Sequence, residues 1–294
     1  MTPVRRLPDV LSLRPDHDGF LVDLWGVIHD GERLGEGVRD ALGALAASGA
    51  RVLFLSNSSR LGDLLEEGLV TMGVPRTWFV GALSSGDVTR AALLRRDPDV
   101  FTGLPPSPRV LHVGNPGFVP WLFELGLDFC DEATEADLVV ATGTVADARA
   151  LDELRERLAP LAARGTPLVC TNPDRVLPAR GTLALAPGAI AHAYAELGGR
   201  THLYGKPHAP IYREALPRLG VAPERVVAIG DMIDTDVRGA RAAGLTSVLV
   251  TTGVHASELG EAPDEAALAA TFAHHRGAPD AILASFGSRA GSPP

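Results

Sequence analysis

The sequence alternates short apolar runs with longer amphipathic stretches along most of its 294 residues. Apolar runs of this kind are typical of strands that are buried on both faces of a parallel sheet, with the amphipathic stretches as the covering helices. The pattern predicts strands at 20–22, 51–55, 109–113, 138–141, 168–170, 226–229 and 247–250. It predicts helices at 38–47, 61–72, 88–95, 147–162, 190–197 and 209–219. The fold class expected is therefore α/β, with a doubly wound parallel sheet.

One part of the chain has a strand and helix pattern of its own. It extends over 82–181 and contains two proline-rich stretches, 104–108 and 173–178. We therefore expect an α/β domain at 82–181, inserted into a Rossmann-like core formed by 1–81 and 182–294.

Composition excludes several classes of function. The formal net charge of −9 disfavours nucleic acid and anionic membrane as partners. The sequence has no apolar run near the roughly 20 residues of a membrane span, and its first residues lack the apolar region of a secretory signal. Two cysteines, Cys130 and Cys170, suit a reducing compartment, so a cytoplasmic location is expected. The sequence does not determine the oligomeric state, and a homo-oligomer is compatible with it.

The basic residues are unusual, because Lys206 is the single lysine among 27 lysines and arginines. A composition that replaces lysine by arginine wherever a surface charge suffices keeps a lysine where a compact ammonium is needed. This observation marks Lys206 as a candidate functional residue before any motif is considered.

Polar side chains follow three of the predicted strands. Asp23 follows the first, Ser56 and Asn57 follow the second, and Asp231 follows the strand at 226–229. A doubly wound sheet binds ligands at the carboxyl ends of its strands, so these side chains are expected to converge. Asp231 begins a run of three acids that continues with Asp234 and Asp236. Mg²⁺ is the usual cation that neutralises such a cluster.

These residues together suit phosphoryl transfer: a carboxylate nucleophile, a hydroxyl, an ammonium and a metal-binding acid. Their order resembles the motif series of the haloacid dehalogenase superfamily, and most closely its NagD-like subclass IIA. The resemblance covers nearly the whole chain and is carried by five segments: Asp23-Leu24-Trp25-Gly26-Val27, Phe54-Leu55-Ser56-Asn57, Thr171-Asn172-Pro173-Asp174, Gly205-Lys206-Pro207 and the run GDMIDTD at 230–236.

The resemblance implies a role for each matching residue. Asp23 would be the nucleophile and a metal ligand, and Lys206 would stabilise the phosphorylated state. Ser56, Asn57 and Asn172 would bind the phosphate or substrate. Mg²⁺ would be held by Asp23, the Trp25 carbonyl and Asp231, with Asp236 and Asp234 in supporting positions behind it. The implied activity is hydrolysis of a small phosphorylated metabolite, such as a sugar phosphate or nucleoside monophosphate, and the segment 82–181 would be the cap domain.

The sequence departs from the family's phosphatases at one position. Two residues beyond the nucleophile they carry an Asp that protonates the leaving oxygen and later activates water, and here that residue is Trp25. An indole cannot transfer these protons, which are typically worth 10²- to 10⁴-fold in rate. Three nearby residues are candidates to replace it: His29, Asp30 and His208.

Trp25 also keeps a second hypothesis open, namely a catalytically impaired protein that binds a phosphorylated metabolite on the same fold. A phospho-receiver domain is disfavoured, because it needs about half this length and carries its acids near the N-terminus. Gly114 and Gly117 do not complete a dinucleotide-binding fingerprint.

Overall fold

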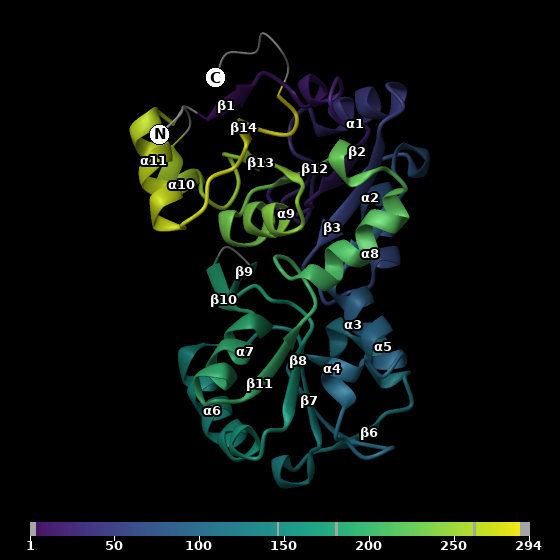
Figure 1. The fold of residues 1–294 in the computed structure, drawn as a ribbon, viewed down its shortest axis with the longest axis vertical. Helices are drawn as coiled ribbons and strands as arrows, with labels where there is room; N and C mark the ends of the chain where they lie inside the picture. Colours follow the sequence, from purple (N-terminus) through teal and green to yellow (C-terminus); the bar gives the residue numbers. More distant parts are fainter. Residues whose placement is uncertain (1–3, 146, 180–181, 261–262, 289–294) are drawn as a thin grey trace. The chain divides into compact units, whose positions relative to one another are not determined.

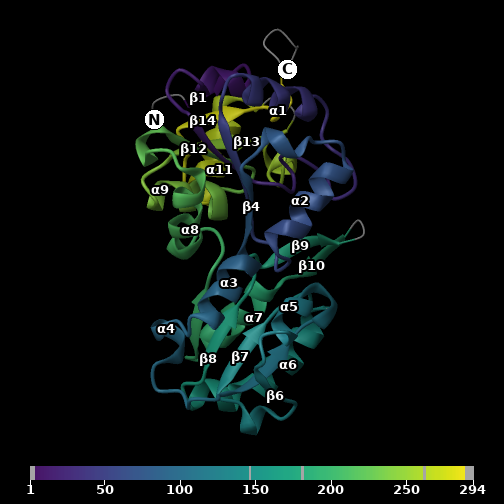
Figure 2. The same cartoon turned by 90° about the vertical axis from the view of Figure 1, so that its right-hand side faces the viewer.

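The structure is a computed structural model that describes residues 4–145, 147–179, 182–260 and 263–288. The chain divides into two compact units (Figures 1 and 2). The first unit comprises Met1–Ser56, Gly62–Leu83 and Lys206–Pro294, and the second comprises Asn57–Leu61 and Ser84–Gly205.

The first unit is built on a sheet in which, among the described residues, seven strands are aligned. Their spatial order is β1 (Arg5–Leu7), β14 (Ala281–Leu283), β13 (Thr246–Val250), β12 (Val226–Gly230), β2 (Gly19–Val22), β3 (Arg51–Ser56) and β4 (Gly81–Ser84). Every neighbouring pair from β1 to β3 is parallel. The central strands β2 and β12 are buried along their whole length, which explains why their sequences are apolar without alternation.

Helices cover both faces of this sheet. They are α1 (Val38–Ala47), α2 (Gly62–Thr71), α8 (Ala209–Leu219), α9 (Arg238–Ala242), α10 (Ala256–Leu259) and α11 (Glu265–His274). Short 3₁₀ turns lie at Val10–Leu13, Arg76–Trp78 and Pro223–Arg225, and a π-helical turn lies at Ile233–Val237.

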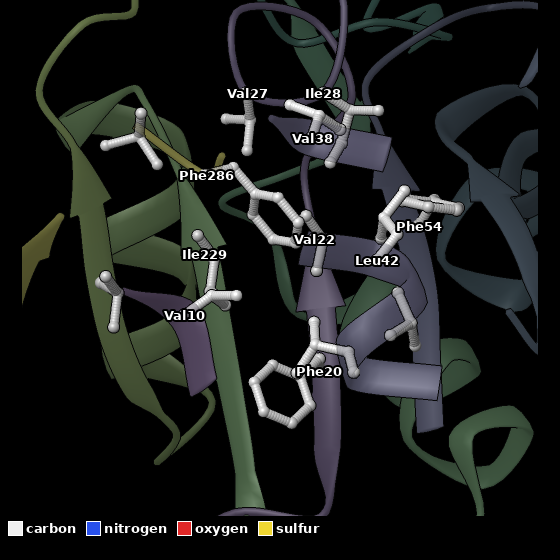
Figure 3. Packing of buried hydrophobic residues seen from close by; sticks show 14 of the residues in the cluster. Val10, Phe20, Val22, Val27, Ile28, Val38, Leu42, Phe54, Ile229 and Phe286 are labelled. Carbon is white, nitrogen blue, oxygen red and sulfur yellow. The ribbon is translucent and has the colours of Figure 1, made fainter. Parts of the chain in front are cut away.

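Successive residues of a strand face opposite sides of the sheet, so the first unit has a separate apolar layer on each side. On one side Phe20 and Phe54 pack with Leu42 of α1 (Figure 3). On the other side Leu249 and Phe272 belong to a cluster that joins β13 to α11. The sheet is thus held from both faces, and its strand ends are left to carry polar groups.

The second unit has its own parallel sheet. Its spatial order is β11 (Arg200–Leu203), β8 (Pro167–Cys170), β7 (Leu138–Ala141), β5 (Arg109–Val113) and β6 (Asp128–Cys130). A separate antiparallel pair is formed by β9 (Val176–Ala179) and β10 (Thr182–Leu185).

The helices of the second unit are α3 (Ser85–Leu94), α4 (Pro98–Phe101), α5 (Pro120–Phe123), α6 (Ala148–Ala163) and α7 (Pro187–Glu196), with 3₁₀ turns at Pro116–Phe118 and Ala133–Glu135. Figure 1 shows α6 and α7 on one side of the sheet and α3 to α5 on the other. Local sequence explains where two of these helices begin. Ser84 and Asp87 form a capping box at the start of α3, and the Asp147 side chain accepts a hydrogen bond from the Ala150 N–H in α6.

The second unit ends later in the chain than the sequence predicts. The predicted end, Gly181, lies outside the described residues, and the compact unit continues to Gly205. The reason is that β11 pairs in parallel with β8, while Tyr194 of α7 donates a hydrogen bond to the Thr166 carbonyl (2.7 Å). The helix α7 and the strand β11 therefore belong to the second unit, and β11 adds a strand to its sheet.

Within the described residues, no helix combines the length and apolar character needed to cross a bilayer. Cys130 and Cys170 are both buried free thiols.

Candidate active site

Strands β2, β12 and β3 are adjacent and parallel, so their carboxyl ends lie on one edge of the sheet. The chain proceeds from β2 to β3 on one side, whereas β12 leads to β13 on the other. The strand order therefore reverses between β2 and β12, which is where doubly wound sheets bind ligands. Asp23 follows β2 at this point, and its N–H donates to the Ile229 carbonyl of β12 (2.9 Å).

Lys206 connects two of the acids at this edge. Its Nζ donates to Asp23 Oδ1 at 2.7 Å and to Asp236 Oδ1 at 2.6 Å. The lysine is 3% exposed, so both ion pairs are shielded from water. A short ammonium reaches both carboxylates here, as the single lysine in the composition suggested.

Burial and charge act in opposite directions on these groups. Burial raises the pKa of Asp23 to about 7, against the lowering effect of Lys206. Burial lowers the pKa of Lys206, but the two carboxylates outweigh it and raise that pKa above its ordinary value, so the amine stays charged. Burial also raises the pKa of Asp231, and the charge of Asp23 adds to the effect. The edge therefore holds more carboxylate than its ammonium can neutralise.

The Asp231 carboxylate lies in a tight backbone cradle. Its Oδ2 accepts a hydrogen bond from the Val254 N–H (2.9 Å). A Cβ at Gly26 would lie 2.1 Å from Asp231 Oδ2, and one at Gly253 would lie 2.2 Å from the same oxygen. Gly26 has φ +78°, a conformation that favours glycine in any case. Only glycine permits the backbone to approach this carboxylate so closely.

Asp23, Asp231 and Asp236 each offer an oxygen within 4.8 Å of the others. Two buried carboxylates and the partly buried Asp23, with Lys206 as a counter-charge, form a set of hard oxygen donors with excess negative charge. Such a set fits a divalent cation. Asp236 is also bound by the Met232 N–H through Oδ2 (3.1 Å), so it faces both the lysine and its own turn.

The three residues predicted to bind phosphate or substrate are Ser56, Asn57 and Asn172, and they are divided between the two units. Ser56 is the last residue of β3, on the same sheet edge as Asp23. Asn57 and Asn172 belong to the second unit, where both bind Asp174. Asn57 Nδ2 donates to Asp174 Oδ1 at 2.8 Å, and Asn172 Oδ1 accepts from the Asp174 N–H at 2.9 Å.

Asp234, for which the resemblance implied a supporting role behind the metal, lies outside the carboxylate cluster. Its carboxylate is paired with Arg238 and with His275 Nδ1, the latter at 2.8 Å. The π-helical turn at Ile233–Val237 separates the directions of its acids, because Asp236 faces Lys206 while Asp234 faces α11.

Trp25 is 38% exposed. Of the candidates to replace the missing acid, His29 accepts a hydrogen bond from the Gly31 N–H through Nδ1 (3.0 Å), and burial lowers its pKa. Burial also lowers the pKa of His208, the residue that precedes α8. Burial thus favours the neutral imidazole at both positions. Asp30 Oδ1 accepts from the N–H groups of Glu32 and Arg33, which occupies it as a turn residue.

Sequence reasoning missed the residues that hold the predicted ones. Gly253 and Val254 follow β13, a predicted strand whose polar ending at Thr251 and Thr252 was the available signal. Asp174, the partner of both asparagines, had no signal beyond its place in the TNPD turn.

Comparison with known proteins agrees with this geometry. Residues 20–128 match the family model described as haloacid dehalogenase-like hydrolase, and residues 203–275 match a HAD-hydrolase-like model. The chain is 29% identical to the sugar-phosphatase AraL of Bacillus subtilis over 238 residues, which cover 80% of this chain and 83% of that protein. It is 31% identical to human chronophin over 261 residues, covering 83% and 84% of the two chains.

Solved structures give the same result. A haloacid dehalogenase-like hydrolase from Brucella suis 1330 matches with a TM-score of 0.74 and 31% identity, covering 96% of this chain and 98% of that one. A p-nitrophenyl phosphatase from Archaeoglobus fulgidus matches with a TM-score of 0.71 and 28% identity, covering 93% and 98%. The chain belongs to the haloacid dehalogenase-like hydrolases. Within them it is a phosphoric monoester hydrolase of the NagD-like subclass IIA.

Proposed function

We propose that the protein hydrolyses a small phosphomonoester, such as a sugar phosphate or nucleoside monophosphate, through an aspartyl-phosphate on Asp23. The observation that carries the proposal is the bridging of Asp23 and Asp236 by Lys206, with Asp231 beside them at the strand-order reversal. Relatives named sugar-phosphatase, glycerol-3-phosphate phosphatase and 5'-nucleotidase support this class of substrate.

In the proposed first step, a carboxylate oxygen of Asp23 attacks phosphorus as the bond to the leaving oxygen breaks. The Lys206 ammonium lies 2.7 Å from Asp23 and neutralises charge on the transferring group. The Ser56 hydroxyl and the following N–H would hold phosphoryl oxygens. In the second step water attacks phosphorus, the bond to Asp23 breaks, and inorganic phosphate is released with a proton. The assignment of Asn57 and Asn172 to phosphate binding stays a prediction from the resemblance.

Mg²⁺ is the cofactor that we propose. Asp23, Asp231 and the Trp25 carbonyl would hold it, with Asp236 behind them orienting Lys206. The excess of buried carboxylate over ammonium supports this assignment. When bound, the ion would offset the negative charge of the phosphoryl group and allow it to approach Asp23. We also propose the second unit as the cap domain of the subclass.

Trp25 makes the first step sensitive to the leaving group. An aryl oxide departs as a stabilised anion, whereas a sugar alkoxide needs a proton that an indole cannot give. His29 or His208 would have to be protonated before it could supply that proton, and burial disfavours the protonated form; without it alkyl phosphates would react slowly. The binding-protein hypothesis follows if neither replaces the missing Asp.

A phosphatase assay tests the proposal. The protein is freed of metal with EDTA, dialysed, and assayed with p-nitrophenyl phosphate and a panel of sugar phosphates and nucleoside monophosphates, with and without Mg²⁺. We expect turnover that requires Mg²⁺ and that the Asp23→Asn variant lacks. Saturable binding of a phosphorylated metabolite without turnover in either protein would instead identify a binding protein.

A further inference from the structure

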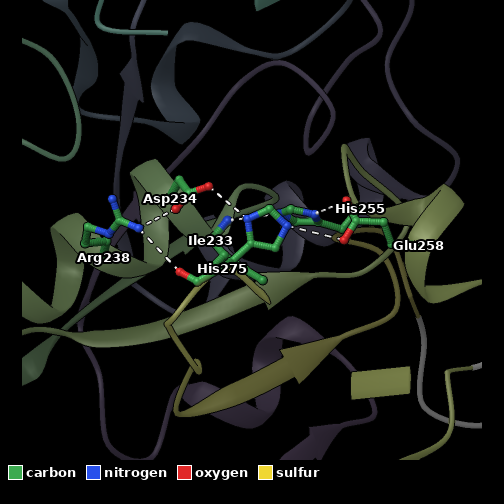
Figure 4. A network of polar contacts seen from close by, with 6 residues as sticks. All are labelled: Ile233, Asp234, Arg238, His255, Glu258 and His275. Carbon is green, nitrogen blue, oxygen red and sulfur yellow. Dashed lines mark hydrogen bonds and ion pairs between the residues drawn. The ribbon is translucent and has the colours of Figure 1, made fainter. Parts of the chain in front are cut away.

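A chain of polar side chains joins the turn after β12 to α10 and to the end of α11 (Figure 4). Asp234 lies at one end, His275 and Glu258 follow, and His255 completes the chain against the backbone of Ile233. None of the catalytic steps above uses these groups. This series of hydrogen-bonded side chains nevertheless ends at Ile233, two residues from Asp231.

Val254 and His255 bind the residues on either side of Met232, the first at the Asp231 side chain and the second at the Ile233 backbone. The Val254 N–H donates to Asp231 Oδ2 at 2.9 Å, and His255 Nε2 accepts from the Ile233 N–H at 3.2 Å. His255 is 2% exposed, so water cannot readily replace it as the acceptor. Two consecutive residues after β13 thus fix the position from which the Asp231 carboxylate projects.

The hydrogen-bond directions fix the proton on His255. Because the Ile233 N–H occupies the lone pair of Nε2, the proton of the neutral ring lies on Nδ1. Nδ1 faces Glu258 Oε1 at 3.5 Å. Glu258 Oε2 in turn lies 3.3 Å from His275 Nε2, and His275 Nδ1 lies 2.8 Å from Asp234 Oδ2. Burial lowers the pKa of His255, which agrees with a neutral ring.

The same direction argues against a second metal centre. His255, Glu258 and His275 present ligand atoms within 4.8 Å of one another, as a metal site would. A metal needs the lone pair of His255 Nδ1, which would move the ring proton to Nε2, against the Ile233 N–H. The cluster is therefore better explained as a hydrogen-bonded support than as a ligand set.

We propose that His255 is a positioning residue that holds the turn at 231–236 so that the carboxylate of Asp231 faces Asp23. Glu258 fixes the tautomer of His255, and His275 joins Glu258 to the far side of the same turn through Asp234. This inference rests on the proposed role of Asp231 in holding Mg²⁺. Its analogue in metal sites is the outer group that orients a ligand, whose removal typically weakens metal binding about 10- to 100-fold.

Mg²⁺ titration calorimetry on the full chain tests the proposal, with thermal unfolding run on each variant. His255→Leu removes the acceptor and should raise the Kd for Mg²⁺ about 10- to 100-fold. His255→Gln keeps an acceptor that can reach the Ile233 N–H, and should recover most of that loss. The matched control is His192→Leu, an exposed histidine on α7 of the second unit, which should bind Mg²⁺ as the wild type does.

The outcomes separate the inference from the proposal on which it rests. If Asp231→Asn leaves the Kd unchanged, the metal assignment fails. If Asp231→Asn weakens binding but His255→Leu does not, or if His255→Gln is as poor as His255→Leu, only the positioning role fails. If His255→Leu does not fold, two other variants test the positioning role. That role predicts weakened Mg²⁺ affinity for Glu258→Gln and near-normal Mg²⁺ affinity for His255→Gln. Stoichiometric Zn²⁺ binding to Asp231→Asn that His275→Leu abolishes would overturn the support in favour of a metal centre.

Discussion

The two units are built on the same plan, yet the carboxyl edges of their sheets differ in charge. In the first unit this edge carries Asp23 and Asp231 around a buried ammonium. In the second unit the residues that follow the central strands β7 and β8 are neutral: Thr142 binds His112 Nε2 at 2.6 Å, and Thr171 binds Ser59 at 2.6 Å. A parallel sheet therefore positions side chains at its carboxyl edge whatever their type. Reactivity there requires buried charges that the neighbouring groups neutralise only in part.

The largest effect should come from the nucleophile of the charged edge. Asp23→Asn keeps the shape of the side chain and removes its nucleophilic oxygen, so kcat should fall at least about 10⁴-fold. The matched substitution at the neutral edge is Asn115→Ala, after β5, which should leave kcat/KM for p-nitrophenyl phosphate unchanged. A comparable loss from Asn115→Ala would remove the contrast between the two edges.

Replacing Trp25 should increase the catalytic efficiency of the carboxyl edge of the first unit. Trp25→Asp introduces the missing acid and should raise kcat/KM for a sugar phosphate by up to about 10²- to 10⁴-fold, and for p-nitrophenyl phosphate much less. Steady-state kinetics on both substrates in both proteins measure the ratio. If the wild type already treats the two classes equally, another group gives the proton, and His29→Gln and His208→Gln become the next variants.

Lys206→Arg tests whether charge alone is sufficient at this edge. The guanidinium retains the charge but cannot occupy the space of an ammonium that lies 2.7 Å and 2.6 Å from two carboxylates. We expect kcat to fall by about 10²-fold and the Kd for inorganic phosphate to rise. Unchanged phosphate affinity and turnover would mean that the single lysine is an accident of composition.

The smallest effect is expected at the opposite, amino edge of the same sheet. Asp18 precedes β2 and pairs with Arg225 and Arg14 in an exposed position. Hydrogen bonds from Arg225 and Arg14 hold the pKa of Asp18 at about 2, below its ordinary value of 3.8. This carboxylate therefore stabilises the fold above pH 3.8, and its contribution is lost as the pH falls toward 2.

Because water screens an exposed pair, Asp18→Asn should lower Tm at pH 7 by no more than a few degrees. The difference from wild type should vanish near pH 2. Thermal unfolding at the two pH values measures both. A large loss at pH 7 would show that charge matters at the amino edge as well.

Much of the first unit follows from its sequence, because its strands are buried on both faces and read as uninterrupted apolar runs. The edges were harder to predict. β1 and β14 have three residues each, too few to stand out as strands, and three of the four residues of β11 are polar. α11 was missed because its alanines are spread around the helix and blur the period. The predicted end of the inserted domain was too early because the polar sequence of β11 gave no strand signal, although β11 belongs to the sheet of the second unit.

At the site, strand position predicted that Asp23 and Asp231 come together, and the family resemblance implied that Lys206 and Asp236 lie beside them. They were insufficient for Asp234, because the π-helical turn changes which side chains of the acidic run share a face. They were also insufficient for Gly253 and Val254, whose contribution is backbone shape and one N–H. Backbone groups carry no residue-specific pattern, so only the folded chain shows them.

Because Lys206 is the single lysine and is buried, its reaction with an amine reagent would report local opening of the site. Amine-reactive reagents acylate uncharged amines, and the only lysine amine of this sequence is held as an ammonium between two carboxylates and 3% exposed. Acylation of Lys206 therefore waits for a fluctuation that breaks both ion pairs and admits solvent. The rate of mass gain at this one side chain would measure how often the site comes apart, without any engineered residue.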